Sequence, residues 1–388
     1  MKPAVVCVGE SGINGLATVR ALGRRGVPVH VVALRTSPQI ASASRYCRSL
    51  TLAAELSTLH ESLVGFEPGA LLYVDNDPML KALAPHAEAL AERFALVEEI
   101  GAAPRLTDKD FQVRVARQAG IAVPRTWSPA SWDELESLAT KKRLIAKPAS
   151  RRLGFKALIA SDTAQLAAML RARNAAPADV LVQEFIEGDD SQIYAGLCYR
   201  ARSREQCFVL SARKLRQTQP GAGVMAVGQV TDTPQVREMT RRLVKAAGAR
   251  GVFSTEFKLD AGDGRWYFIE WNPRPAYFQS IGWKAGFDLA WLAYCDHADP
   301  ARLAGMDSAF SGTHYWVNLH GDLMHLSKAP RIATDVKTWR PYLGRHEWAV
   351  FAADDPAPWR KALRQLGGWL SKRSFFGRAS RPQTAPGA

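Results

Sequence analysis

The 388-residue sequence predicts a mixed α/β (α+β) protein whose first domain is a doubly wound, Rossmann-like sheet. Residues 3–8 are an apolar strand, residues 9–15 are a glycine-containing turn, and a helix to about residue 25 leads to a second strand at 27–33. This strand–helix–strand order is typical of a parallel sheet with covering helices. Farther along, strands alternate with helices and end in a hairpin, which indicates a second α/β unit.

The glycine turn gives only weak support for dinucleotide binding. Gly9, Gly12 and Gly15 are spaced G-x-x-G-x-x-G instead of G-x-G-x-x-G, and the second strand ends in Leu34-Arg35 without an acid. A tight turn that packs the helix on the strand explains the glycines at least as well. An NAD(P)-binding oxidoreductase therefore stays as one alternative function.

A third predicted strand, residues 70–74, is followed directly by the polar residues Asp75 to Asp77. Polar groups at the carboxyl end of such a strand often line a ligand crevice. A helical region at 79–95 then leads to a domain boundary near residues 101–105. Thr107 is the expected N-cap of the next helix.

The second unit contains a strand that carries one lysine. Lys147 follows Leu-Ile-Ala in the strand 144–148, so a buried or cleft-facing ammonium there needs a partner. The turn 150–156 carries three cations and Gly154, which suits it to fold over a triphosphate. The other expected elements are helices at 162–173 and 234–249 and strands at 180–185, 192–200, 206–213 and 224–230.

Two β-forming runs between residues 251 and 275 flank the turn 261–264 and predict a hairpin. With the turn at its centre, Glu256 and Glu270 lie opposite each other, with Cβ atoms roughly 5 Å apart, where like charges are destabilising. Asn272 points from the same face as Glu270. Two carboxylates and an amide oxygen suit Mg²⁺. An ordinary hairpin with surface acids is the alternative.

Positive charge is concentrated at the C-terminal end. The net charge is +14, and residues 329–388 contribute eleven Lys/Arg against four Asp/Glu. A surface helix is expected at 358–373, with a membrane-surface helix as its alternative, and the tail from Ser374 is expected to be disordered. A basic protein that binds nucleic acid or a membrane surface is therefore a second alternative function.

The sequence contains no apolar run long enough for a transmembrane helix, and its N-terminus lacks the features of a signal peptide. Its five cysteines are dispersed and include no CxxC pair. That pattern indicates free thiols in a reducing compartment. A cytoplasmic protein is expected.

The chain carries a series of candidate residues in a fixed order: Lys109, Lys147, the basic turn with Gly154, the run Gln183 to Asp190, Glu256, Glu270, Asn272 and Arg274. In this order, the residues resemble the ATP-grasp superfamily of carboxylate–amine ligases, and within it the carbamoyl-phosphate-synthase-like and D-aspartate-ligase-like group. The resemblance covers roughly residues 3–300, and its most specific part is the run Glu270 to Arg274 (EWNPR) after the TEFKLD strand. Many members have more glycines in the turn around Gly154. The resemblance implies a pre-ATP-grasp domain at 1–104, an ATP-grasp domain at 105–305 with a smaller lobe at 105–185 and a larger lobe at 186–305, and a basic C-terminal extension at 306–388.

The resemblance also implies roles for the site residues. An ATP site would be formed by Lys109 and Lys147 at the phosphates, Gly154 in the covering loop, the linker residues Gln183, Glu184, Phe185 and Ile186 at the adenine, and Asp190, with Glu187 as second choice, at the ribose. The catalytic group would be Lys214 and Arg216 near the γ-phosphate and Arg274 at the tetrahedral intermediate. Mg²⁺, with Mn²⁺ as its substitute, is expected at Glu256, Glu270 and Asn272.

The expected activity is ATP-dependent ligation, in which a carboxylate is activated as an acyl phosphate and then joined to an amine. A carboxylate kinase, or a ligase that uses another nucleophile, is the alternative within the superfamily. The expected partners are small-molecule carboxylate and amine substrates, without nucleic acid. A homodimer is one option for the assembly, because dimers are frequent among relatives. The sequence identifies neither the acid nor the amine.

Overall fold

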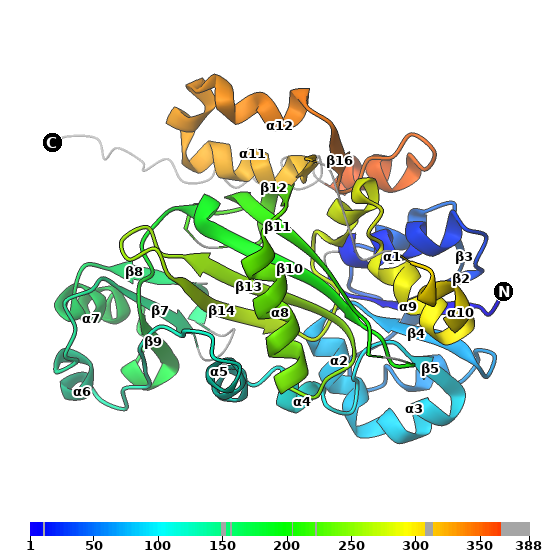
Figure 1. Cartoon of the computed structure of the whole chain (residues 1–388), viewed down its shortest axis with the longest axis horizontal. Coiled ribbons are helices and arrows are strands. Elements are labelled where there is room, and N and C mark those ends of the chain that lie inside the picture. The colour runs from blue at the N-terminus through cyan, green and yellow to red at the C-terminus, as the bar shows by residue number, and fades with distance from the viewer. Residues whose placement is uncertain are drawn as a thin grey trace, which may run out of the picture.

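The computed structural model describes residues 1–10, 12–148, 153–155, 157–203, 205–221, 223–306 and 313–365. It contains three β-sheets, with the N-terminal sheet at one end of the molecule, a four-stranded sheet at the other end and a seven-stranded sheet between them (Figure 1). Across these ranges, no helix has the length and apolar character needed to cross a membrane.

The N-terminal domain is a five-stranded parallel sheet with strand order β3-β2-β1-β4-β5. Its elements are β1 (Ala4–Val8), α1 (Ile13–Gly23), β2 (Val29–Leu34), β3 (Cys47–Ala53), β4 (Ala70–Val74), α2 (Asp77–Leu83), α3 (Ala87–Arg93) and β5 (Phe94–Leu96). β1 and β4 are buried along their whole length, as expected for central strands of a parallel sheet. This confirms the predicted opening and third strand. The sequence pattern misses the edge strands, because most of β3 is exposed or half-buried and β5 is very short.

A four-stranded antiparallel sheet with order β6-β9-β7-β8 follows. Its elements, with the two helices that precede it, are α4 (Ala103–Leu106), α5 (Lys109–Gln118), β6 (Thr126–Trp127), α6 (Trp132–Glu136), β7 (Leu144–Pro148), β8 (Leu158–Ala160), α7 (Thr163–Arg171) and β9 (Val180–Glu184). The expectation that Thr107 caps α5 is wrong. Asp108 is the N-cap, because its carboxylate accepts the N–H of Phe111 at 2.7 Å. Thr107 instead follows α4 and donates its hydroxyl to the carbonyl of Ala103.

The third sheet has seven strands in the order β14-β13-β10-β11-β12-β15-β16. Its strands are β10 (Ile193–Arg200), β11 (Cys207–Gln217), β12 (Met225–Thr231), β13 (Gly251–Leu259), β14 (Trp266–Asn272), β15 (Tyr315–Val317) and β16 (His346–Trp348). The antiparallel pair β13–β14 confirms the predicted hairpin. β15 and β16 come from the predicted C-terminal extension, so part of that extension continues this sheet beyond residue 305.

Helix α8 (Pro234–Ala246) packs on one face of the seven-stranded sheet. The two elements approach closely at Gly196 of β10, where an added Cβ would lie 2.1 Å from the hydroxyl of Thr240. Thr240 also shares a 2.8 Å hydrogen bond with Thr255 of β13. A residue without a Cβ is therefore required where the helix crosses the sheet.

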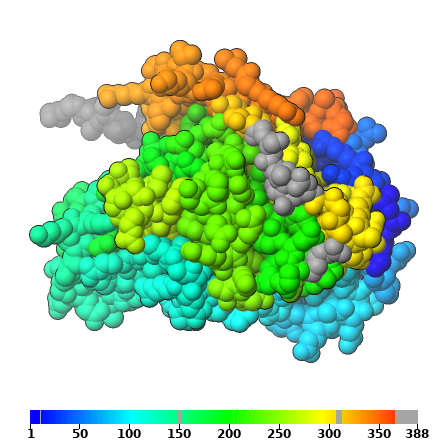
Figure 2. Space-filling view, viewed as in Figure 1, coloured from blue at the N-terminus to red at the C-terminus, as the bar shows by residue number. Residues whose placement is uncertain are grey.

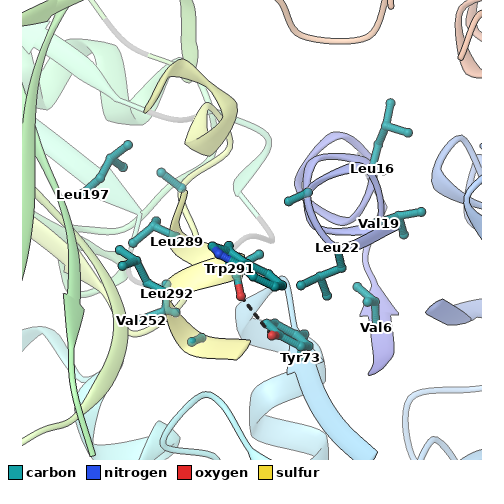
Figure 3. Packing of buried hydrophobic residues seen from close by; sticks show 14 of the residues in the cluster. Val6, Leu16, Val19, Leu22, Tyr73, Leu197, Val252, Leu289, Trp291 and Leu292 are labelled. Carbon is teal, nitrogen blue, oxygen red and sulfur yellow. Dashed lines mark hydrogen bonds between the residues drawn. The ribbon is translucent and has the colours of Figure 1, made fainter. Parts of the chain in front are cut away.

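The opposite face of that sheet packs against the N-terminal domain. Leu197 of β10 and Leu22 of α1 belong to one buried core, together with Trp291 of α9 (Leu289–Ala298). Figure 3 shows Trp291 between the α1 side chains and those of β10 and β13. Tyr73 donates its hydroxyl to a backbone carbonyl of α9 at 3.0 Å. A continuous apolar core thus holds the two domains together.

The C-terminal part adds α10 (Pro300–Ala304), α11 (Leu319–Lys328) and α12 (Arg340–Leu343). Residues 357–365 are helical, with Trp359 partly buried against the main core and Leu363 45% exposed. This first half of the predicted surface helix is confirmed. Leu366, Leu370 and Lys372 of that helix, and the tail from Ser374, lie outside the described residues.

Candidate active site

A cavity of about 1020 Å³ is lined by residues from all three sheet regions. Ten of the predicted site residues line it: Lys109, Lys147, Gln183, Glu184, Phe185, Ile186, Lys214, Glu256, Glu270 and Asn272. The other five, Gly154, Glu187, Asp190, Arg216 and Arg274, are not among its lining residues. The structure therefore brings most of the predicted nucleotide and metal site into one space.

The acidic wall of the cavity is the hairpin β13–β14. Glu256 pairs directly with Glu270 across the two strands, as the sequence predicted, and the register shifts just after Glu256. The side-chain amide of Asn272 lies 3.5 Å from a Glu270 carboxylate oxygen. The described residues contain no cluster of three or more His, Cys, Asp and Glu side chains suited to a metal. Two carboxylates and one amide oxygen nevertheless form a donor set that fits a hard divalent cation such as Mg²⁺.

Lysines face both carboxylates. Nζ of Lys214 lies 2.7 Å from Glu256, and Nζ of Lys109 lies 3.3 Å from Glu270. Burial raises the pKa of Glu256 above its ordinary value, because it outweighs the attraction of Lys214. Burial would also raise the pKa of Glu270, but the attraction of Lys109, Lys214 and Lys147 lowers it to about 2. Glu270 therefore stays ionised at neutral pH, beside cations that suit phosphate groups.

Lys147 lines the cavity from strand β7, in which Leu144 and Ala146 are buried and the other three residues are half-buried. Burial lowers its pKa, and the attraction of Glu270 opposes that shift. In the turn that follows β7, Gly154 has a φ of +69° with open space around it, a conformation that favours glycine. Arg151, Arg152 and Lys156, the cations predicted to cover the phosphates, lie outside the described residues.

The linker after β9 passes along the cavity wall. The N–H of Glu184 donates to the carbonyl of Arg125 at 2.9 Å, and the N–H of Phe185 donates to the carbonyl of Arg143 at 2.7 Å. These two donors are satisfied within the protein, and adenine binding by the linker stays a prediction. Lys258, which also lines the cavity, lies over the Phe185 ring at 4.4 Å from its centroid.

The two acids considered for the ribose have other partners. The carboxylate of Asp190 is buried and accepts hydrogen bonds from the side-chain amide of Gln217 at 2.8 Å and from the N–H of Gly221 at 3.0 Å. Glu187 forms a partly exposed ion pair with Arg143 at 3.4 Å. In this structure Asp190 holds the loop after β11, and ribose binding by either acid stays a prediction.

The two arginines predicted to be catalytic each form an ion pair. The register of β11 shifts between Lys214 and Arg216, and the two side chains have different partners. Lys214 lines the cavity, whereas Arg216 forms a buried, two-pronged pair with Asp322 of α11. Arg274 forms a similar pair with Asp77 at the start of α2, with contacts of 2.8 and 3.1 Å.

The glycine turn after β1 is filled by protein groups. A Cβ at Gly9 would lie 1.7 Å from the side-chain amide of Asn76, and the N–H of Gly9 donates to Asp75 at 2.7 Å. Asn14 donates to the carbonyls of Asp75 and Pro275, at 2.9 and 3.3 Å. The turn thus joins the end of β4 to the chain after β14, which agrees with the tight-turn interpretation of its glycines.

Among the polar residues of the cavity that sequence reasoning did not assign, Asp77, Gln217 and Lys258 each contact a predicted site residue. Asp77 carried a signal, because polar residues at the end of β4 were expected near a ligand. Lys258 lies in the same TEFKLD run as Glu256, which is a weaker signal. Gln217 carried only its place directly after Arg216, and its contact with the cavity follows a register shift in β11.

The model of a known protein family, the ATP-grasp domain, matches residues 106–276. No curated protein sequence matches the chain. Several solved structures are similar to it. N5-carboxyaminoimidazole synthetase from Staphylococcus aureus, complexed with ADP, has a TM-score of 0.58 at 15% identity and covers 76% of this chain and 78% of its own. L-amino acid ligase from Bacillus licheniformis has a TM-score of 0.59 at 15% identity, over 81% and 79%.

A third similar structure is the biotin carboxylase domain of 2-oxoglutarate carboxylase from Hydrogenobacter thermophilus, solved with MgADP and bicarbonate. Its TM-score is 0.62 at 16% identity, over 81% of this chain and 74% of that one. At such identities the likeness establishes a shared fold. The likeness covers most of this chain, well beyond the matched domain.

Proposed function

Because the chain is a member of the ATP-grasp superfamily, we propose that it is an ATP-dependent ligase that activates a carboxylate as an acyl phosphate and joins it to an amine. The observation that carries the proposal is the pair Glu256 and Glu270, which faces Lys109 and Lys214 inside one cavity beside the linker. Bound ADP in two of the similar structures supports ATP as the nucleotide.

In the first step, an oxygen of the substrate carboxylate attacks the γ-phosphorus of ATP. The bond to the bridging oxygen breaks, ADP leaves, and the phosphoryl group stays on the acid as an acyl phosphate. Lys147 of β7 and Lys109 at the start of α5 both line the cavity and would neutralise the phosphates. Mg²⁺ bound by Glu256, Glu270 and Asn272 would supply further positive charge at the phosphates.

In the second step, the neutral amine attacks the acyl carbon, phosphate leaves, and the ammonium proton passes to solvent or phosphate. No side-chain nucleophile is needed, so the protein acts through positioning and charge stabilisation. Arg274 donates to Asp77, to the carbonyl of Pro275 and to Asn272, so we propose that it acts as a fixed positive charge. Arg216 pairs with Asp322 and is not among the lining residues of the cavity, so we propose no direct contact between it and the phosphates.

The proposal is tested by measuring ADP and phosphate release with Mg²⁺ across a pool of carboxylic acids, each with and without amines. Stimulation by one acid together with one amine supports the ligase and identifies the substrate pair. Stimulation by an acid alone, with an acyl phosphate trapped by hydroxylamine, favours a carboxylate kinase or another nucleophile. A protein that binds no ATP would contradict the proposal.

The location and assembly of the enzyme are part of the same proposal. All five cysteines are free thiols, which supports a reducing, cytoplasmic compartment. We also propose small-molecule substrates. The cavity is large enough for a nucleotide and a small acid, and both positively and negatively charged side chains line it. Size-exclusion chromatography with light scattering tests the homodimer.

A further inference from the structure

A buried ion pair joins the C-terminal helices to the end of strand β11. Arg216 contacts both carboxylate oxygens of Asp322 in α11, at 2.6 and 2.8 Å, and also donates to the carbonyl of Thr338 at 3.1 Å. Tyr342 of α12 donates its hydroxyl to the same carboxylate at 2.6 Å. Asp322 has no exposed surface and Arg216 only 7%. Burial of such a pair costs desolvation free energy, and the groups around it indicate what the pair does.

The same helix holds the next residues of the chain. A ring nitrogen of His325 lies 2.6 Å from the carbonyl of Gln217. At Gly321, an added Cβ would be 3.0 Å from the methyl group of Thr218. Figure 1 shows α11 and α12 above the end of the seven-stranded sheet, and Figure 2 shows this segment forming the upper surface of the molecule. The C-terminal helices therefore support β11 from outside the cavity.

From Gln217 the contacts continue into the cavity. Its side chain donates to Asp190 at 2.8 Å and accepts from Lys214 at 3.3 Å. Lys214 in turn lies 2.7 Å from Glu256, one of the three predicted metal ligands. Asp190 also accepts the N–H of Gly221, so the loop after β11 is part of the same network. Every side chain in this series is buried or half-buried.

The register shift in β11 gives the end of this strand contacts on two faces. Because of the shift, Lys214 and Gln217 contact each other at the cavity, while Arg216 contacts α11. A strand end of this kind lacks a regular ladder to fix it. The ion pair to Asp322 anchors it on one face, and the network with Glu256 orders it on the other.

We propose that Asp322 is a positioning residue: by holding Arg216, it keeps Lys214 and Gln217 aimed at Glu256. The C-terminal helices, which the ATP-grasp family match does not include, then set the geometry at the metal and phosphate end of the cavity. The catalytic consequence rests on the proposed ligase function, whereas the structural consequence does not. The two parts are therefore measured separately.

The test compares Asp322→Asn with Asp355→Asn in the full-length chain. Asp355 is a matched control, because it is also a fully buried carboxylate of the C-terminal segment paired with a buried arginine, Arg20, at 2.9 Å. The first readout is backbone hydrogen exchange of peptides covering residues 213–224. We expect the amides of Gln217 and Gly221 to exchange about tenfold faster or more in Asp322→Asn, and as in the native protein in Asp355→Asn.

The second readout is steady-state kinetics with MgATP, once a stimulating acid is known. We expect Asp322→Asn to lower kcat by about tenfold or more while KM for ATP changes little, because the linker and Lys109 do not depend on this contact. Tyr342→Phe, which removes one hydrogen bond and leaves the ion pair, should give a smaller change in the same direction and serves if Asp322→Asn does not fold.

Several results would overturn the inference. Native exchange at residues 213–224 in both Asp322→Asn and Tyr342→Phe would show that the pair does not order the strand end. Equal exchange changes in the Asp322 and Asp355 variants would reduce the effect to general destabilisation. If the protein turns over no ATP with any acid, the proposed function fails, but hydrogen exchange still decides whether Asp322 orders the loop.

Discussion

Replacement of Glu270 by glutamine is the most direct test of the cavity. Its carboxylate lies 3.3 Å from Lys109, and it also attracts Lys214 and Lys147. Glutamine keeps the size of the side chain and removes the charge, so the three lysines lose their shared counter-charge. The substitution also removes one of the two carboxylates proposed to bind Mg²⁺.

The pKa of Glu270 gives the size of the effect on stability. A drop from 4.5 to about 2 corresponds to about 3 kcal/mol of folding free energy for a buried group. The side chain is 37% exposed, so solvent screens the lysines, and we expect Glu270→Gln to cost about 1–2 kcal/mol at pH 7. A lowered carboxyl pKa stabilises the fold above pH 4.5, and that contribution is lost as the pH falls toward 2.

The activity should change far more than the stability. We expect ATP turnover to fall by about 10²–10³-fold or more and Mg²⁺ to lose its effect on ATP affinity. Calorimetric ATP titrations with and without Mg²⁺, phosphate release and urea denaturation measure these effects. Glu136→Gln is the matched control, because Glu136 pairs with Arg171 at 2.9 Å outside the cavity. Full, Mg²⁺-dependent turnover by Glu270→Gln would refute the metal assignment.

Three further variants test separate contacts. Because burial raises the pKa of Glu256 above 4.5, Mg²⁺-dependent ATP affinity should fall as the pH is lowered from 7 toward that value, and calorimetry of Glu256→Gln should show no such titration. Asp77→Asn should weaken the interdomain pair with Arg274, lower thermal stability by about 1–3 kcal/mol and reduce turnover; an unchanged melting temperature would contradict this. Gly196→Ala should cost about 1–3 kcal/mol in urea denaturation, because its Cβ would meet Thr240, while ATP affinity of the folded protein stays native.

The contacts of the cavity come from distant parts of the chain. Arg274 and Asp77 are 197 positions apart, and Arg216 and Asp322 are 106 positions apart. The Arg274 pair connects the segment after β14 to α2, and the Arg216 pair connects β11 to α11. The site is therefore sensitive to how α2 and α11 are seated, although neither helix carries a predicted metal or phosphate ligand.

The sequence by itself determined the features that depend on local spacing. The turn at residues 261–264 placed Glu256 opposite Glu270, because residues at equal distances from the centre of a hairpin lie opposite each other. The apolar context of Lys147 likewise predicted a lysine that enters a cleft, and the strand–helix–strand opening predicted the parallel sheet. Each of these follows from the order and spacing of residues that lie close together in the sequence.

Only the tertiary structure decided what each arginine and acid contacts. A register shift in β11 moved Arg216 away from the cavity and put Gln217 there, and no residue pattern in the strand announces such a shift. Asp190, expected at a ribose, accepts hydrogen bonds from Gln217 and from Gly221 in the loop after β11. Asp108, and not Thr107, is the N-cap of α5. The physical reason is that a charged side chain can be buried only against whichever opposite charge or hydrogen-bond partner the packing of distant elements supplies.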